Sequence, residues 1–241
     1  MNDLRQLPAR LAVVRARIAA ACARAGRDPA AVVLVGVSKT HPAAAVEAAW
    51  RAGLAVFGEN RVQEALGKSA ELAHLPPPQG PEWHLIGPLQ SNKVRPALDL
   101  FRTIHSIDRP KIAAAVDREA AARGLSVVGF AEVNVGGEAS KHGFAPDGLA
   151  AALRPLADLT HLRIAGLMAI PPAGERPEES RPWFVRLREL RDALAARPEW
   201  RDRWAAGGGW LSMGMSHDFA VAVEEGATHV RVGTAIFGAR P

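Results

Sequence analysis

Short apolar runs rich in β-branched residues alternate with helical segments along almost the whole 241-residue sequence. A run such as VVLVGV, at 32–37, is typical of a parallel strand that is buried on both faces. Eight strands are expected, and they cover 31–39, 54–60, 83–87, 100–108, 125–135, 161–170, 210–215 and 229–238. This regular alternation of strands and helices predicts an α/β fold built on a parallel sheet.

Eight strand–helix units predict a closed (β/α)8 barrel, and a doubly wound open sheet is the alternative. One extra helix is expected before the first strand, because apolar residues recur there at helical spacing: Leu4, Leu7, Leu11, Val14 and Ile18. We favour this folded helix over a transit peptide, which the arginine-rich start would also fit. Proline- and glycine-rich stretches at 76–81 and 171–177 are interpreted as loops, so one domain over 1–241 is expected.

The composition excludes several classes of protein. No apolar run approaches the roughly 18 residues of a membrane span, and arginines interrupt the N-terminal segment, so neither a membrane anchor nor a secretory signal is expected. The net charge is +5, but basic and acidic residues are interleaved and aromatic residues make up only 5%, which argues against nucleic acid. The single cysteine, Cys22, cannot form an internal disulfide and fits the reducing cytoplasm.

Polar residues gather where the expected strands end, and (β/α)8 barrels carry their active sites at that end. The first strand ends on Lys39, although a buried ammonium is costly unless it is paired or neutralised. Asn60 lies at the end of the second strand, His84 lies in the third, and Met168 lies at the end of the sixth. Each has an ordinary interpretation, since Asn60 could cap a helix and the other two could be core residues. Their convergence on one rim favours a functional site.

The segments MGMSHD and VGTA follow the seventh and eighth strands. Backbone N–H groups at Ser216 and at the start of the next helix, together with Gly233 and Thr234, would bind an anion. The loops after strands 7 and 8 often form the phosphate site of this fold. The sequence therefore predicts a phosphate site there, and two ordinary turns are the alternative.

A lysine at the end of the first strand and a phosphate site at the last two strands are neighbours in a closed barrel. A lysine amine beside a bound phosphate suggests a phosphorylated aldehyde. Pyridoxal 5′-phosphate (PLP) is the obvious example, because its aldehyde forms a Schiff base with a lysine. Arg231, inside the eighth strand, could then donate to the pyridine nitrogen.

Sequence motifs spread over 37–240 resemble the family of pyridoxal phosphate homeostasis proteins. They are VSKTHP, FGENRVQE, WHLIGPLQSNKVR, IHSID, GGEASKHGF, GLMAIPP, LSMGMSHDF and VRVGTAIFGAR. The resemblance implies the barrel of the alanine racemase N-terminal domain and a role in intracellular PLP homeostasis, as a carrier or buffer. A monomer is expected, because such a site needs no residue from a partner and no long apolar surface helix is evident. PLP-dependent apoenzymes are candidate acceptors.

By the same resemblance, Lys39 carries the Schiff base and Arg231 faces the pyridine nitrogen. The phosphate would be held by Ser216, Gly233 and Thr234. Asn60 and Met168 match motif residues that line the cofactor, and His84 and Ser212 are further, weaker matches.

Racemisation needs an acid–base group on each face of the substrate, and alanine racemase uses a lysine and a tyrosine from a partner's C-terminal domain. This chain contains no tyrosine, and its eighth expected strand reaches 238, so no such domain is expected. An arginine at the pyridine nitrogen also weakens the cofactor as an electron sink. We therefore expect a non-catalytic PLP carrier. A racemase-like PLP enzyme is one alternative, and a phosphate-binding regulatory module without a Schiff base is another.

Overall fold

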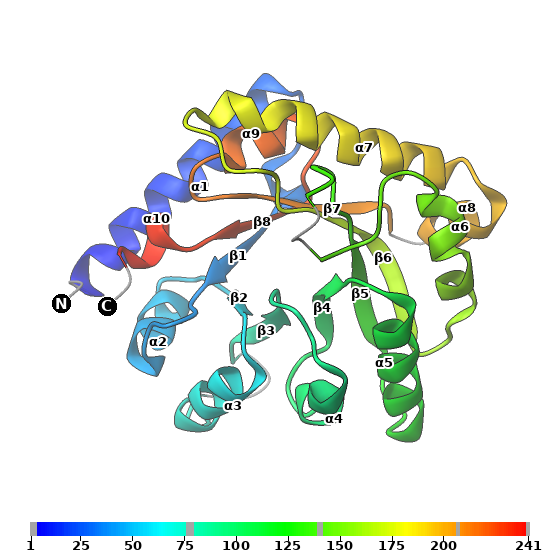
Figure 1. The fold of residues 1–241 in the computed structure, drawn as a ribbon. Helices are drawn as coiled ribbons and strands as arrows, with labels where there is room; N and C mark the ends of the chain where they lie inside the picture. Colours follow the sequence, from blue (N-terminus) through cyan, green and yellow to red (C-terminus); the bar gives the residue numbers. More distant parts are fainter. Residues whose placement is uncertain (1–3, 76–79, 139–141, 206–207, 240–241) are drawn as a thin grey trace.

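A closed barrel of eight parallel strands forms the centre of the computed structural model, which describes residues 4–75, 80–138, 142–205 and 208–239 (Figure 1). Each strand pairs with the next in sequence, and β1 pairs with β8 to close the barrel. The strands are β1 Val33–Val37, β2 Val56–Glu59, β3 Glu82–Leu85, β4 Thr103–Ile107, β5 Val127–Glu132, β6 Leu162–Met168, β7 Trp210–Met215 and β8 His229–Val232.

Helices surround the barrel (Figure 1). The α-helices are α1 Leu7–Arg24, α2 Ala43–Arg51, α3 Val62–Glu71, α4 Val94–Ala97, α5 Pro110–Ala122, α6 Leu149–Leu153, α7 Arg181–Ala195, α8 Pro198–Ala205, α9 Phe219–Glu224 and α10 Thr234–Phe237. Short 3-10 turns are η1 Leu4–Gln6, η2 Pro29–Ala31, η3 Ser91–Lys93, η4 Arg154–Asp158 and η5 Pro177–Ser180. No helix within the described ranges is both long and apolar enough to cross a membrane.

The barrel and its extra N-terminal helix are confirmed, and the open-sheet alternative is wrong because β1 and β8 are paired. Most strands are shorter than expected, and two differences in boundaries lie beside the predicted phosphate loops. The eighth strand ends at Val232 instead of continuing to 238, because the backbone turns at Gly233 and α10 follows. The helix after β7 begins at Phe219 and not directly after the strand, because the Asp218 carboxylate accepts the Met215 N–H and holds a turn in between.

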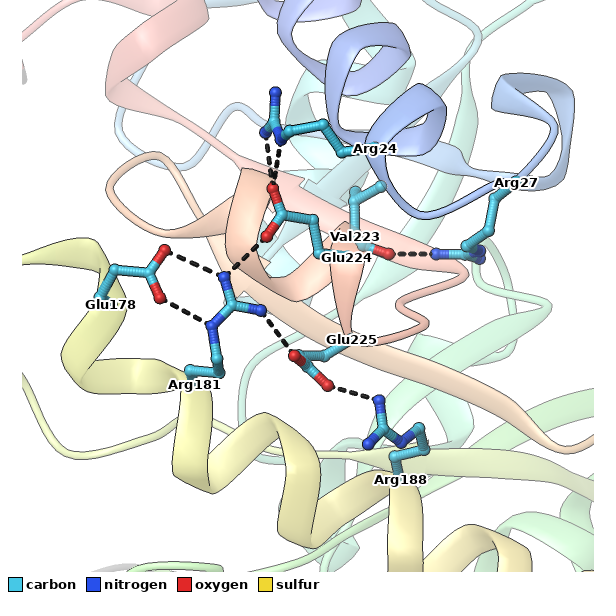
Figure 2. A network of polar contacts seen from close by, with 8 residues as sticks. All are labelled: Arg24, Arg27, Glu178, Arg181, Arg188, Val223, Glu224 and Glu225. Atoms are coloured by element: carbon cyan, nitrogen blue, oxygen red, sulfur yellow. Dashed lines mark hydrogen bonds and ion pairs between the residues drawn. The ribbon is translucent and has the colours of Figure 1, made fainter.

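The helix α1 packs mainly against α9 and α10 through the predicted apolar face, except that Leu4 lies before the helix and is 38% exposed. Polar contacts fix its C-terminal end to α9 (Figure 2). Arg24 pairs with Glu224, and the Arg27 guanidinium donates to the carbonyls of Val223 and Ala227. This packing supports a folded helix at the start of the chain.

The start of α7 is joined to α9 by an ion-pair network (Figure 2). Arg181 pairs with Glu178, Glu224 and Glu225 at 2.6–2.7 Å, and Arg188 also pairs with Glu225. These hydrogen bonds raise the pKa of Arg181 above its usual value. Single exposed pairs contribute little to stability, but this group shares its charges among three elements.

Aromatic and histidine side chains from four strands meet inside the barrel. His105 stacks on Phe130 with ring centroids 4.4 Å apart, and His229 contacts both rings edge-on. His84 lies 5.1 Å from His105 between centroids. These residues come from β3, β4, β5 and β8 and are buried, so polar rings fill part of an interior that apolar side chains usually occupy.

Candidate functional site

A cavity of about 290 Å³ opens at the C-terminal ends of the strands, where β1, β7 and β8 meet. Its volume is close to the lower limit of the roughly 300–1,000 Å³ common for small-molecule sites. The predicted site residues that line it are Lys39, Asn60, Ser216, Arg231, Gly233 and Thr234. Residues that are far apart in the sequence thus meet at one place on the barrel rim.

The turn that carries Lys39 is fixed on both sides by hydrogen bonds. The sequence predicted that Lys39 is the last residue of the first strand. In the structure β1 ends at Val37, so Lys39 lies two residues beyond the strand. The Ser38 hydroxyl donates to Glu59 at 2.7 Å, and the Thr40 N–H donates to Glu64 at 2.6 Å. Thr40 has φ of 68°, a left-handed conformation that is unfavourable for a β-branched residue and needs such support.

Lys68 provides the buried positive charge beneath this turn. Its ammonium donates to Glu59 and Glu64 at 2.7 Å each, and to the Ser38 carbonyl at 2.8 Å. Burial raises the pKa of the Glu59 carboxyl, although the bonds from Lys68 and Ser38 favour its charged form. This cluster was not predicted from the sequence, although a Glu64–Lys68 pair at helical spacing after Glu59 was its signal.

Arg231 lies in β8 with 4% of its surface exposed, and it reaches the cavity. One terminal nitrogen donates to the Ser212 hydroxyl at 2.5 Å, and the other donates to the Ala169 carbonyl at 2.9 Å. Burial lowers the pKa of Arg231 to about 10, so the side chain remains a cation at neutral pH.

The loops after β7 and β8 are joined through Ser216. Its hydroxyl accepts the backbone N–H groups of Gly233 at 3.1 Å and Ala235 at 3.4 Å. A Cβ atom at Gly233 would lie 3.3 Å from the Val37 carbonyl oxygen, so glycine allows the β8 loop to approach β1 closely. Backbone N–H groups and a hydroxyl therefore converge where the sequence predicts an anion site.

Three further candidates lie elsewhere. Met168 is fully buried at the end of β6 and is not among the described residues that line the cavity. Ser212 and His84 are also buried, and both belong to the polar interior of the barrel. Ser212 contacts Arg231 directly, whereas His84 is hydrogen-bonded to Glu82 and His105.

The cavity also contains two histidines that the sequence analysis did not select. His41 is buried and stacks on Phe237 with centroids 5.3 Å apart, and His217 lies next to Ser216. The signal for both was present in the motifs SKTHP and GMSHD, where each follows a selected residue closely.

Two other cavities meet this one at Asn60. One, of about 250 Å³, is lined by Glu132, and burial raises the pKa of that carboxyl. The other, of about 1000 Å³, is lined by Arg61, Lys93 and Arg109. This second cavity is larger, but Lys39 and the loops after β7 and β8 line the 290 Å³ cavity instead. The 290 Å³ cavity is therefore the candidate site. The described residues contain no cluster of metal ligands.

The site combines a primary amine, a buried guanidinium and converging N–H groups. The two side-chain cations favour an anionic ligand, and the N–H groups with the Ser216 hydroxyl suit tetrahedral oxyanions. A primary amine at the other wall can attack an electrophilic carbonyl. A phosphorylated aldehyde has both properties.

Residues 10–241 match the family "Alanine racemase, N-terminal domain". The chain is 51% identical over 232 residues to the pyridoxal phosphate homeostasis protein of Pseudomonas aeruginosa, covering 95% of this chain and 94% of the relative. The structure of PipY from Synechococcus elongatus with PLP bound has 40% identity and a TM-score of 0.81, over 97% of this chain and 100% of that one. Alanine racemase from Corynebacterium glutamicum shares the fold, with a TM-score of 0.72 and 15% identity over 99% of this chain and 62% of that one.

Proposed function

Because the chain belongs to the pyridoxal phosphate homeostasis proteins, within the alanine racemase N-terminal domain family, we propose that it binds PLP at the mouth of its barrel. The observation that carries this proposal is one cavity lined by Lys39, Arg231 and the Ser216 loop. The PLP-bound structure of PipY, 40% identical over nearly all of this chain, supports it.

The residues present fit the cofactor. Lys39 provides the amine, and Arg231 provides a buried donor that remains charged and cannot accept a hydrogen bond. The Ser216 hydroxyl already gathers the Gly233 and Ala235 N–H groups, as a phosphate oxygen would. When bound, the cofactor supplies an aldehyde that condenses with a primary amine and releases water.

In this proposal each part of the chain has a separate task. Lys39 holds the ligand covalently, and the bonds at Ser38 and Thr40 keep its turn in place. Arg231 donates to the ring nitrogen and orients the ring. Ser216, Gly233 and Thr234 bind the phosphate, and Asn60 lines the wall between the neighbouring cavities.

Lys39→Ala is the direct test of the attachment. Purified protein is incubated with PLP, reduced with borohydride and digested, and the modified peptide is identified by mass spectrometry. We expect the adduct on Lys39 in the parent protein and its loss in the variant. Lys111→Ala, on the exposed face of α5, is the matched control and should keep the full yield. An adduct of unchanged yield in Lys39→Ala would refute the assignment.

We further propose that the protein carries or buffers PLP without turning over an amino acid. Two features support this: the sequence contains no tyrosine, and Arg231, which we assign to the ring nitrogen, keeps its proton at neutral pH. An unprotonated ring withdraws electrons weakly, so carbanion formation at a substrate Cα is favoured less. The proposal includes delivery of PLP to apo forms of PLP-dependent enzymes and a monomeric state of the protein.

Hydrogen exchange at Cα distinguishes a carrier from a racemase-like enzyme. PLP-loaded protein is incubated with L-alanine or L-serine in deuterated water, and Cα deuteration is followed by NMR. The carrier predicts exchange no faster than with free PLP at equal concentration. Rapid enzyme-dependent exchange would establish catalysis instead. Sedimentation of the same sample reports whether the protein is a monomer.

A further inference from the structure

The hydrogen bonds of Arg231 continue through the interior of the barrel. Arg231 donates to Ser212 at 2.5 Å, and Ser212 lies 2.7 Å from Nδ1 of His105. Nε2 of His105 lies 3.0 Å from Nδ1 of His84, and Nε2 of His84 lies 2.9 Å from Glu82. Glu82 is the first residue of β3, and 62% of its side chain is exposed. The chain thus leads from the ligand cavity to the opposite end of the barrel.

The two ends of this chain fix the direction of every bond in it. A guanidinium can only donate, so the Ser212 hydroxyl accepts from Arg231 and is free to donate to Nδ1 of His105. His105 must then carry its proton on Nε2 and donate to Nδ1 of His84. His84 in turn donates from Nε2 to the Glu82 carboxylate, which can only accept.

Burial of these side chains supports this direction of the hydrogen bonds. Ser212 and His105 have 0% of their surface exposed, and His84 has 3%, so bulk water does not compete for these bonds. Burial lowers the pKa of His105 well below its usual value, and the neighbouring His84, His229 and Arg231 act in the same direction. A neutral His105 has one donor and one acceptor, which is what the chain requires.

The reverse order would leave a group unsatisfied. If His105 carried its proton on Nδ1, Ser212 would receive two donors, Arg231 and His105. Its own hydroxyl proton would then have no acceptor among the contacts that the described residues make with it. Leaving a buried hydroxyl proton without an acceptor is unfavourable, because the group has lost its hydrogen bonds to water. Only one order satisfies all four bonds.

We propose that Ser212, His105, His84 and Glu82 are positioning residues that hold Arg231 in one orientation through a single directed chain of hydrogen bonds. Ser212 and the two histidines lie outside the described lining of the PLP cavity, so they act through Arg231. The proposal rests on the proposed function in one respect, which is that Arg231 contacts bound PLP. The direction of the hydrogen bonds from Arg231 to Glu82 does not depend on whether PLP is bound.

The proton order can be measured without any cofactor. Two-bond ¹H–¹⁵N correlation spectra of the apoprotein distinguish the tautomers of its eight histidines, and single substitutions assign the signals. We expect both His105 and His84 to carry the proton on Nε2 and to have an unprotonated Nδ1 at neutral pH. A proton on Nδ1 of either ring would overturn the proposal. The expected tautomers together with no PLP binding would instead refute only the proposed function.

Substitutions test whether the chain positions Arg231. Ser212→Ala removes the first link, and His105→Phe retains a ring that can stack on Phe130. We expect both to shift the guanidinium ¹⁵N signals of Arg231 and to weaken PLP binding about tenfold, the scale of one hydrogen bond to a charged group. If His105→Phe fails to fold, Ser212→Ala carries the test alone.

His229→Phe is the matched control. His229 touches the His84 and His105 rings, but its described hydrogen bond is with Thr228 and lies outside the chain. We expect the Arg231 signals and the PLP affinity to remain within about twofold of the parent. If His229→Phe disturbs Arg231 as much as Ser212→Ala does, core packing explains the effect and the proposal is wrong. Unchanged Arg231 signals in Ser212→Ala would also overturn it.

Discussion

Two lysines serve the turn after β1 in different ways. Lys39 lies on the cavity wall and is assigned to react, whereas Lys68 is buried and bound to two carboxylates and a carbonyl. Both carry the same functional group, so their roles follow from their surroundings. A lysine with all three donors engaged is a structural cation, and removing it should affect the fold before it affects the chemistry.

Lys68→Met tests this structural role. The substitution leaves Glu59 buried without its cation, and breaking a buried pair in this way costs about 3–5 kcal/mol. We expect a loss of that size in urea unfolding and weaker PLP binding, because Ser38 loses its support. Lys111→Met, at an exposed position of α5, should change stability by less than about 0.5 kcal/mol. A stable Lys68→Met protein with unaltered PLP affinity would contradict the assignment.

At the scale of elements, apolar runs predicted all eight strands, because strands covered on both faces carry an unusually clear hydrophobic signal. The helix α10 was missed, since TAIF is apolar and too short for helical periodicity to distinguish it from a strand. The helix α8 was also not expected as a separate element, because only two residues separate its start at Pro198 from the end of α7 at Ala195. Local patterns do not report such boundaries.

The strand β7 contains an irregularity that shapes the phosphate loop. Its register with β8 shifts between Ser212 and Met215, and Gly214 has φ of 89° there. A Cβ atom at Gly214 would lie 2.5 Å from the Cβ of Ala222 in α9. Glycine therefore allows both the backbone turn and the close approach of the helix that follows.

Gly214→Ala should accordingly lower both stability and PLP affinity. The strained backbone and the contact with α9 are expected to cost about 1–3 kcal/mol in urea unfolding, and the displaced Ser216 should weaken the phosphate contacts. Gly67→Ala is the control, because Gly67 lies in α3 with no atom within 4 Å of an added Cβ. That variant should be neutral or up to about 1 kcal/mol more stable. Equal effects of the two changes would contradict this explanation.

Part of the candidate site could be predicted from the sequence, because its residues lie next to the ends of the predicted strands. Motif residues next to strand ends could be placed on the rim once the barrel was expected, and six of them line one cavity. The supporting groups could not be found in this way. The Glu59–Lys68 pair depends on how α3 packs beside β2, and the His84–His105 contact depends on the register of β3 with β4.

Considered as a whole, the molecule holds neutral imidazoles in its core, and this makes its stability depend on pH. Burial lowers the pKa of His229 from 6.5 to about 3 and that of His105 well below 6.5. Between about pH 3 and pH 6.5 the unfolded chain therefore binds more protons at His229 than the native protein does. The stabilisation is thus fully present above 6.5 and decreases as the pH falls through this window.

Urea unfolding between about pH 7 and pH 5 measures this dependence. Each neutral buried histidine should lower the free energy of unfolding by about 1.4 kcal/mol per pH unit below 6.5. His229→Phe should reduce the slope by one such increment. A free energy of unfolding that stays constant over this range would show that the core histidines bind protons in the native state as they do in the unfolded chain.

The pairing of β1 with β8 makes the candidate site a seam between the beginning and the end of the barrel. Lys39 follows the first strand, whereas Gly233 and Thr234 follow the last. A chain emerging from the ribosome therefore cannot offer both walls of the cavity until its eighth strand has been synthesised and has docked. A ligand held by both walls would oppose opening of the seam and shift the equilibrium toward the closed barrel. Loading would then report that folding is complete.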